Sequence, residues 1–323
     1  MTKLLIICGP TATGKTALAI DIAKKFGGEI VSADSRQVYK EMDIGTGKDL
    51  PKGSTYKAVL GNYGFYEIKG VKIWGYDLVE PTKQFSVANY TRFAQKTIQH
   101  IIKRGKLPIL VGGTGLYIKA VVDGIPTAFI PKNESLRKNL AGKTLAELFE
   151  NLAQLDPIKA ALLNVSDRKN PRRLIRAIEV AQWRLKSGRK EKIRIKKYDS
   201  LFIGLNAPKN YLFEKIEKRV DERINRGLER EIKKLFEKGV TWESQAMSSL
   251  GYRQWKLYFE KKETRDKVID IWKNEEKKYA KRQITWFKKD KRINWFDISK
   301  RRWRNYVEKL IKKWYSNANV SKN

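Results

Sequence analysis

A phosphate-binding motif near the N-terminus limits this chain to folds in which a strand runs directly into a helix. Residues 9–16 fit the pattern G-x-x-x-x-G-K-[ST] at every fixed position, after an apolar run at 4–8 and before a helical pattern at 17–26. Backbone N–H groups of such a loop surround a di- or triphosphate, while the lysine neutralises phosphate charge. We expect Thr16 to be a ligand of Mg²⁺, the cofactor. The predicted diphosphate site comprises Gly9, Pro10, Thr11, Ala12, Thr13, Gly14, Lys15 and Thr16.

The charge of the chain indicates a polyanionic partner. Lysine and arginine number 69 against 35 acidic residues, which gives a net charge of +34. An excess of this size is typical of proteins that bind nucleic acid. A basic bias in the proteins of the source organism is the alternative explanation. No window of the sequence is apolar over 18 residues and the N-terminus does not resemble a signal peptide, so we expect a cytoplasmic protein with no membrane partner.

The scarcity of cysteine and histidine restricts the chemistry. The single cysteine, Cys8, excludes an internal disulfide and a cysteine-built zinc site. The single histidine, His100, lies among apolar residues of a predicted helix and fits a structural role better than a catalytic one. Catalysis must therefore depend on carboxylates, phosphate-binding groups and metal.

The order of strand and helix patterns predicts an α/β fold, with a P-loop parallel sheet flanked by helices. Strands are expected at 3–8, 29–32, 66–68, 72–75 and 107–111, with helices at 15–26 and 87–104. Helical periodicity then dominates, apart from a strand at 200–205 and a long helix that starts near 208. We therefore predict a P-loop core at 1–117, a helical insertion at 118–198, and a return strand followed by an all-helical C-terminal region at 199–323. The basic run 189–197 is predicted to be a loop or linker.

Two further motifs follow strands of the predicted sheet. Asp34 comes directly after the strand at 29–32, and Gly112-Gly113-Thr114-Gly115 ends the strand at 107–111. The carboxyl ends of parallel strands meet at one edge, so both motifs are expected beside the phosphate-binding loop. A helix cap formed by Asp34 and Gln37 is the structural alternative. The glycine-rich segment 42–48 is predicted to be a mobile loop near the phosphate.

These motifs, in this order, resemble the tRNA dimethylallyltransferase family over residues 3–297. The matching stretches are GPTATGKT (9–16), ADSRQVYKEMDIGTGK (33–48), GGTGLYIKAV (112–121), NPRRLIRAIEV (170–180), RVDERINRGLEREI (219–232), SLGYRQ (249–254) and KYAKRQITWFKK (278–289). This chain departs from the family at Gly47, where alanine is common, and in the stretch 74–79.

The resemblance implies transfer of a dimethylallyl group from dimethylallyl diphosphate to N6 of adenosine 37 in tRNAs that read codons beginning with U. Asp34 would hold the N6 amine and accept its proton. Thr16, through Mg²⁺, and Arg219 would act on the leaving diphosphate, so the expected catalytic residues are Asp34, Thr16 and Arg219. The alternative for Arg219 is a solvated helix face.

The resemblance also implies that the protein binds the anticodon stem-loop and extrudes the adenosine from its stack. Nothing in the sequence demands more than a monomer, which is therefore the state we expect. Basic and aromatic residues interleave in the matching stretches, as single-stranded RNA loops require. The expected RNA contacts are Asp34, Ser35, Arg36, Gln37, Thr114, Arg137, Arg172, Arg176, Gly251, Tyr252, Arg253, Lys281, Arg282 and Gln283. For the arginines, the structural alternative is again a solvated face.

Three other functions share part of these features. A P-loop small-molecule kinase shares the loop and the carboxylate, but predicts a shorter chain without so basic a helical half. An adenylate isopentenyltransferase performs the same chemistry on free AMP or ATP and does not need the basic, aromatic C-terminal region. A non-enzymatic RNA-binding protein does not need Lys15, Thr16 and Asp34 at one sheet edge.

Overall fold

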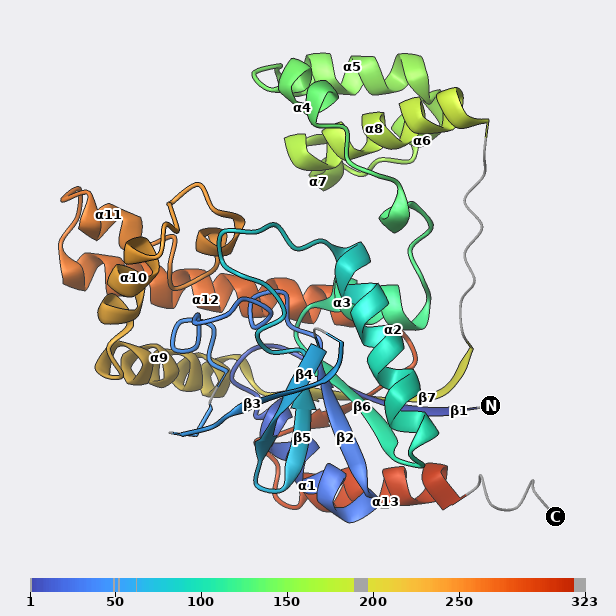
Figure 1. Cartoon of the computed structure of the whole chain (residues 1–323), viewed down its shortest axis with the longest axis vertical. Helices are drawn as coiled ribbons and strands as arrows, with labels where there is room; N and C mark the ends of the chain where they lie inside the picture. Colours follow the sequence, from blue (N-terminus) through green and yellow to red (C-terminus); the bar gives the residue numbers. More distant parts are fainter. Residues whose placement is uncertain (1, 49, 52, 62, 189–196, 317–323) are drawn as a thin grey trace. The chain divides into compact units, whose positions relative to one another are not determined.

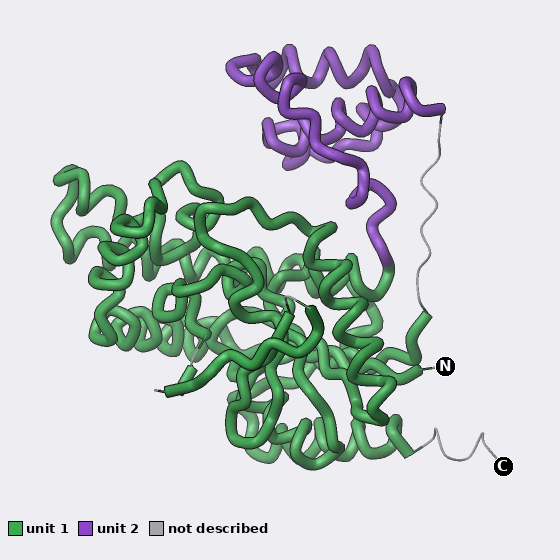
Figure 2. The backbone as a smooth tube through the Cα atoms, viewed as in Figure 1, with its two compact units in different colours: residues 1–123, 196–323 green, residues 124–195 purple. Residues whose placement is uncertain are grey.

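The chain divides into two compact units. The computed structural model describes residues 2–48, 50–51, 53–61, 63–188 and 197–316. Unit 1 comprises residues 1–123 and 196–323, and unit 2 comprises residues 124–195 (Figure 2). Unit 1 is therefore assembled from two separate stretches of the sequence.

An eight-stranded sheet forms the centre of unit 1 (Figure 1). Its strands are β1 (Thr2–Cys8), β2 (Gly28–Ser32), β3 (Tyr56–Leu60), β4 (Tyr63–Ile68), β5 (Val71–Trp74), β6 (Leu107–Gly112), β7 (Tyr198–Asn206) and β8 (Ile293–Asp297). Their order across the sheet is β3-β4-β5-β2-β6-β1-β7-β8. In this order, the six neighbouring strands β5, β2, β6, β1, β7 and β8 are parallel. At one edge of the sheet, β4 pairs antiparallel with both β3 and β5. The parallel arrangement places the carboxyl ends of β1, β2 and β6 side by side.

Helices cover both faces of this sheet because its central strands are apolar on both sides. Along β1, Leu4 and Ile6 belong to one buried cluster, whereas Leu5 and Ile7 belong to the other. Residues of α1 and α13 pack in the second cluster, and Figure 1 shows these two helices on the same side of the sheet. Residues of α2, α3, α10 and α12 pack in the first cluster. The result is a three-layer α/β/α core.

The helices of unit 1 follow the predicted pattern with one break. They are α1 (Lys15–Phe26), α2 (Val87–Lys103), α3 (Gly115–Val122), α9 (Lys209–Asn225), α10 (Leu228–Glu237), η2 (Gln245–Ser248), α11 (Trp255–Phe259), α12 (Arg265–Phe287) and α13 (Trp303–Ser316). The apolar stripe that predicted one long helix beyond residue 208 is divided between α9 and α10. Gly227 between them has a φ of 92°, which ends the first helix and reverses the local backbone.

Unit 2 is a small helical bundle. Its elements are η1 (Pro126–Phe129), α4 (Glu134–Leu140), α5 (Leu145–Leu155), α6 (Pro157–Ala161), α7 (Val165–Arg168) and α8 (Pro171–Ser187). Each of these α-helices starts with a capping residue whose side chain accepts a hydrogen bond from a backbone N–H of the first turn. The capping residues are Asn133, Thr144, Asp156, Asn164 and Asn170. Leu148, Leu152, Leu174 and Ile178 form the centre of its core.

The structure differs from the sequence-based expectation at several elements. The strands β3 and β8 were not predicted, so the C-terminal region is helical except for β8 rather than all-helical. Unit 2 spans 124–195 where the sequence predicted an insertion at 118–198, because α3 packs Ile118 and Val121 into the core of unit 1. Residues 189–196 of the predicted basic linker lie outside the described residues. Among the described residues, no helix is long and apolar enough to cross a membrane.

Candidate active site

The phosphate-binding loop joins β1 to α1 through two positions that require glycine. Gly9 has a φ of 135°, and a Cβ there would lie 2.3 Å from the carbonyl oxygen of Leu205. Gly14 has a φ of 76° just before α1, and no described side chain caps that helix. The Thr13 hydroxyl donates to the Pro10 carbonyl at 2.8 Å, which stabilises the curve of the loop. The first N–H groups of α1 are therefore arranged so that they can bind an anion.

Lys15 is the cation of this loop. Its Nζ donates to the Pro10 carbonyl oxygen at 2.6 Å. Burial and, to a lesser extent, the positive charge of Arg219 lower the pKa of Lys15 to about 8, while Asp34 opposes the change. The negative charge near Lys15 is thus too small to balance its ammonium group. This is expected of a site whose anionic ligand would supply the missing negative charge.

Gln283 connects the phosphate-binding loop to the turn after β6. Its Oε1 accepts from the Thr11 N–H at 2.9 Å, and its Nε2 donates to the Gly113 carbonyl at 2.9 Å. A Cβ on Gly113 would lie 2.2 Å from that Nε2, so the glycine makes the bridge possible. Gln283 was predicted to contact RNA; in the structure both ends of its buried amide bond to the protein's own backbone.

Asp34 lies at the carboxyl end of β2 and lines the same cavity as the phosphate-binding loop. Its Oδ1 accepts from the backbone N–H of Arg36 at 2.8 Å and of Gln37 at 3.4 Å. These bonds stabilise a turn rather than the helix start that the structural alternative required. Across from it, the Thr114 hydroxyl oxygen accepts from the Ser35 N–H at 3.0 Å. The predicted motifs of β2 and β6 are therefore joined directly.

Arg219 reaches the site from α9. Its Nη1 donates to the Thr11 hydroxyl at 3.2 Å, and its Nη2 donates to the Gly47 carbonyl at 3.3 Å. One turn later on the same helix, Arg223 is buried and pairs with Glu276 at 3.2 Å. Sequence reasoning missed Arg223 and Glu276. The i,i+4 spacing of the two arginines on one helix face was the available signal.

These groups enclose a cavity of about 510 Å³ within unit 1. The segment 45–47 contributes to its wall, as expected for the glycine-rich loop. Two acidic side chains, Asp34 and Glu276, line it. Its basic lining residues are Lys15, Arg36, Arg219, Arg223, Arg253 and Arg282. A cavity with six cations and two carboxylates suits a ligand of several negative charges placed beside a proton acceptor.

Three predicted RNA contacts of the C-terminal region lie outside this cavity lining. Tyr252 is fully buried, and its hydroxyl donates to Glu231. Gly251 has a φ of 90°, and a Cβ there would lie 2.8 Å from the Trp272 ring. Lys281 places its Nζ 5.5 Å from the centre of the Phe213 ring. Gly251 and Tyr252 therefore build the interior beneath the site, and their contact with RNA stays a prediction.

The remaining predicted contacts belong to unit 2. Arg137 forms two hydrogen bonds to Glu179, at 2.6 and 2.7 Å, and Arg176 forms one at 3.1 Å. Although burial opposes the change, these bonds and one from the Asn133 N–H lower the pKa of Glu179 to about 2. Arg172 is exposed near the start of α8. Arg137 and Arg176 thus stabilise unit 2, whatever else they bind.

Comparison with known proteins gives a consistent result over nearly the whole chain. Residues 37–290 match the IPP transferase family, and residues 2–56 match the isopentenyl transferase family. The tRNA dimethylallyltransferase of Carboxydothermus hydrogenoformans is 39% identical over 323 residues, which cover 96% of each chain. That of Pediococcus pentosaceus is 40% identical over 306 residues, which cover 92% of each chain.

Solved structures are similar as well. The tRNA isopentenylpyrophosphate transferase of Bacillus halodurans aligns over 100% of both chains with a TM-score of 0.70 and 31% identity. A eukaryotic dimethylallyltransferase acting on tRNA aligns over 100% of this chain and 80% of its own, with a TM-score of 0.78 and 25% identity.

The fold and the basic cavity are those of a P-loop protein with a carboxylate beside its phosphate-binding loop. The matches narrow this class to one family and confirm the family and the fold class predicted from the sequence. The chain belongs to the tRNA dimethylallyltransferase family and is a transferase.

Proposed function

We propose that this chain transfers a dimethylallyl group from dimethylallyl diphosphate to N6 of adenosine 37, in the anticodon loop of tRNAs that read codons beginning with U. One observation carries the proposal most directly: the phosphate-binding loop, Arg219 and the carboxylate of Asp34 line a single cavity. A diphosphate held by the first two groups would place its allylic carbon beside an amine held by the third.

The reaction needs a stabilised leaving group, a positioned nucleophile and a proton acceptor. The N6 nitrogen forms a bond to C1 of the donor while the bond from C1 to the diphosphate oxygen breaks. The loop N–H groups, Lys15 and Arg219 take the charge that develops on the departing diphosphate. Asp34 accepts the proton that N6 loses, so that the products are the modified adenosine and diphosphate.

Mg²⁺ fits the oxygen donors of this cavity. The Thr16 hydroxyl lines it at the start of α1, and the Asp34 carboxylate lines it from β2. The described residues contain no cluster of three or more potential metal-binding side chains of histidine, cysteine or acid type. Mg²⁺ is commonly held by one or two protein oxygens together with substrate phosphates, so such a cluster is not required. Thr16 would hold the ion, which would neutralise charge on the diphosphate.

The acceptor base must leave its stack to enter the cavity, at a cost of a few kcal/mol. Arg36, Arg253 and Arg282 line the cavity together with Tyr279 and supply charge and an aromatic ring for a flipped nucleotide and its neighbours. We further propose that the anticodon stem-loop is the part of tRNA bound, and that unit 2 contacts it through its basic residues. The protein is expected to act as a cytoplasmic monomer.

Radiolabelled dimethylallyl diphosphate tests this function. The protein is incubated with the donor, Mg²⁺ and unmodified tRNA with adenosines at positions 36 to 38, or with AMP instead of tRNA. We expect label in tRNA and none in AMP. Asp34→Ala should lose the transfer, whereas Asp21→Ala, which removes a surface carboxylate paired with Arg304, should keep it. Label in AMP alone would show that the acceptor is a free nucleotide and refute the proposal.

A further inference from the structure

The loop at residues 42–48 is closed by its own hydrogen bonds. The Lys48 N–H donates to the Asp43 carbonyl at 3.0 Å, and the Gly47 N–H donates to the Ile44 carbonyl at 3.1 Å. The Thr46 hydroxyl donates to the Met42 carbonyl. Loop 42–48 is therefore a compact unit, and its position depends on the residues that hold it from outside.

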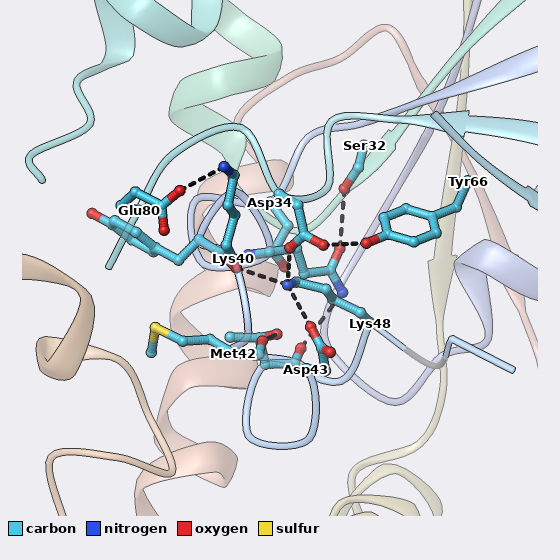
Figure 3. Close-up of polar contacts among 12 residues, drawn as sticks. Ser32, Asp34, Lys40, Met42, Asp43, Lys48, Tyr66 and Glu80 are labelled. Carbon is cyan, nitrogen blue, oxygen red and sulfur yellow. Dashed lines mark hydrogen bonds and ion pairs between the residues drawn. The ribbon is translucent and has the colours of Figure 1, made fainter. Parts of the chain in front are cut away.

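Lys48 anchors loop 42–48 from one side. Its side chain is fully buried, and its Nζ donates to Asp43 Oδ1 at 2.6 Å (Figure 3). The same Nζ also donates to the Tyr39 carbonyl at 2.7 Å and to Asp77 Oδ1. Asp77 in turn accepts from the Tyr66 hydroxyl through Oδ2. All three N–H groups of the ammonium are used, so the lysine fixes three separate parts of the chain at one point.

Glu231 holds the same loop from the other side. From α10, its carboxylate accepts the backbone N–H groups of Asp43, Ile44 and Gly45 at 2.9, 2.8 and 3.1 Å. Burial raises the pKa of Glu231, an effect that these bonds and the Tyr252 hydroxyl oppose. The N–H groups of the loop thus stabilise the buried carboxylate of Glu231. The same bonds tie the loop to α10.

The held loop presents Gly47 to two guanidinium groups. The Gly47 carbonyl accepts from Arg219 Nη2 at 3.3 Å and from Gln37 Nε2 at 3.0 Å. A Cβ on Gly47, whose φ is 63°, would lie 2.4 Å from Nη2 of Arg219 and 2.4 Å from Nη2 of Arg223. The absent side chain therefore makes room for two like charges at one point of the backbone. Glu276 offsets the charge of the second.

We propose that Lys48 is a positioning residue for diphosphate binding: it fixes loop 42–48 so that the Gly47 carbonyl holds Arg219 against the phosphate-binding loop. The proposal rests on the proposed function, in which Arg219 binds the donor diphosphate. Arg219 is held at both ends, by the Thr11 hydroxyl and by the Gly47 carbonyl. Such fixing before the ligand arrives removes the rotamer entropy that a flexible arginine would lose on binding.

A double-mutant cycle tests this role. The variants are Lys48→Met, Arg219→Ala and the two combined, with Lys40→Met as the matched control. Lys40 lies just before loop 42–48 in the sequence, but its side chain pairs with Glu80 at the surface (Figure 3). The measurements are kcat, the KM for dimethylallyl diphosphate, the Kd for inorganic pyrophosphate and the Kd for tRNA.

Lys48→Met is expected to raise the pyrophosphate Kd and the donor KM by about tenfold or more, with the tRNA Kd unchanged. In the Arg219→Ala background, Lys48→Met should cause little further change, because its effect passes through Arg219. Independent effects that multiply in the double variant would overturn the positioning role. A normal pyrophosphate Kd for Arg219→Ala alone would instead refute the diphosphate role of Arg219, so the two failures are distinguishable.

Glu231→Gln provides the second test if Lys48→Met does not fold. This change leaves the Lys48 anchor intact and replaces one of the two carboxylate oxygens that accept the loop N–H groups. We expect a rise in pyrophosphate Kd, and again little further effect in the Arg219→Ala background. An unchanged pyrophosphate Kd for Glu231→Gln would show that fixing the loop is not needed and would overturn the proposal.

Discussion

The lowered pKa of Lys15 makes the affinity for diphosphate depend on pH. Burial is the main cause of the lowered value of about 8, and Arg219 adds to it. Only the ammonium form attracts a diphosphate strongly. The charge is present below the pKa and is lost as the pH rises through it, so binding should weaken on the alkaline side.

The size of the effect follows from the fraction of protein that carries the charge. With a pKa of about 8, Lys15 is charged in about nine-tenths of the free molecules at about pH 7 and in about one-tenth at about pH 9. If only the charged form binds, the apparent Kd is the intrinsic Kd divided by this fraction. The Kd should therefore rise about tenfold between these values, or about 1.4 kcal/mol. Binding above neutral pH should also take up a proton.

Titration calorimetry with inorganic pyrophosphate and Mg²⁺ measures this directly. The control is Lys15→Arg, because a guanidinium stays charged throughout this range. Pyrophosphate itself titrates in the same way with both proteins, so the ratio of the two Kd values isolates Lys15. We expect this ratio to rise about tenfold from about pH 7 to about pH 9. A ratio that stays constant would refute the reasoning.

Three further substitutions have defined outcomes. Asp34→Asn keeps an oxygen for the turn but removes the base, so single-turnover rates should fall about 10² to 10⁴-fold with an unchanged tRNA Kd; a rate near that of the parent would contradict the role. Arg104→Ala leaves the buried Glu29 carboxylate without its paired guanidinium, and urea denaturation should show a loss of about 3 kcal/mol. Because the pKa of Glu29 is lowered in the folded protein despite its burial, this loss should shrink below about pH 4; a loss independent of pH would argue against the ion pair. Gly9→Ala sets a Cβ against the Leu205 carbonyl and should lower the free energy of unfolding by about 3 kcal/mol, and an unchanged Tm would show that the loop can relax.

The parts of the site that were predictable are those that a local pattern defines. The loop at 9–16 has a fixed spacing, and Asp34 follows an apolar strand, so their meeting at one sheet edge follows from the βαβ order alone. The strand β8 lacks such a signal. It is five residues long, and its pairing partner β7 lies about ninety residues earlier in the chain. Its identity as a strand depends on that distant partner.

Buried polar contacts were the part that the sequence could not provide. Lys48, Glu231 and Gln283 are charged or polar residues of types that are mostly exposed, and only the assembled structure gives them their partners. Tyr252 is the opposite case, a residue for which the sequence predicted a partner outside the protein and the structure shows one inside it. Its place in a stretch rich in basic residues predicted contact with RNA, while its hydroxyl has a partner inside the protein.

The position of β1 also determines when the phosphate-binding loop can form during synthesis. β1 pairs with β6 on one side and with β7 on the other, and the ion pair between Lys3 and Asp199 spans 196 residues of chain. A ribosome must therefore complete all of unit 2 before the central strand gains its second neighbour. Contacts so far apart in sequence form slowly, whereas the local helices of unit 2 form early. A nascent chain that ends before β7 lacks the strand against which Gly9 packs, and it also lacks Arg219 and Gln283, so the cavity is complete only after the later helices are made.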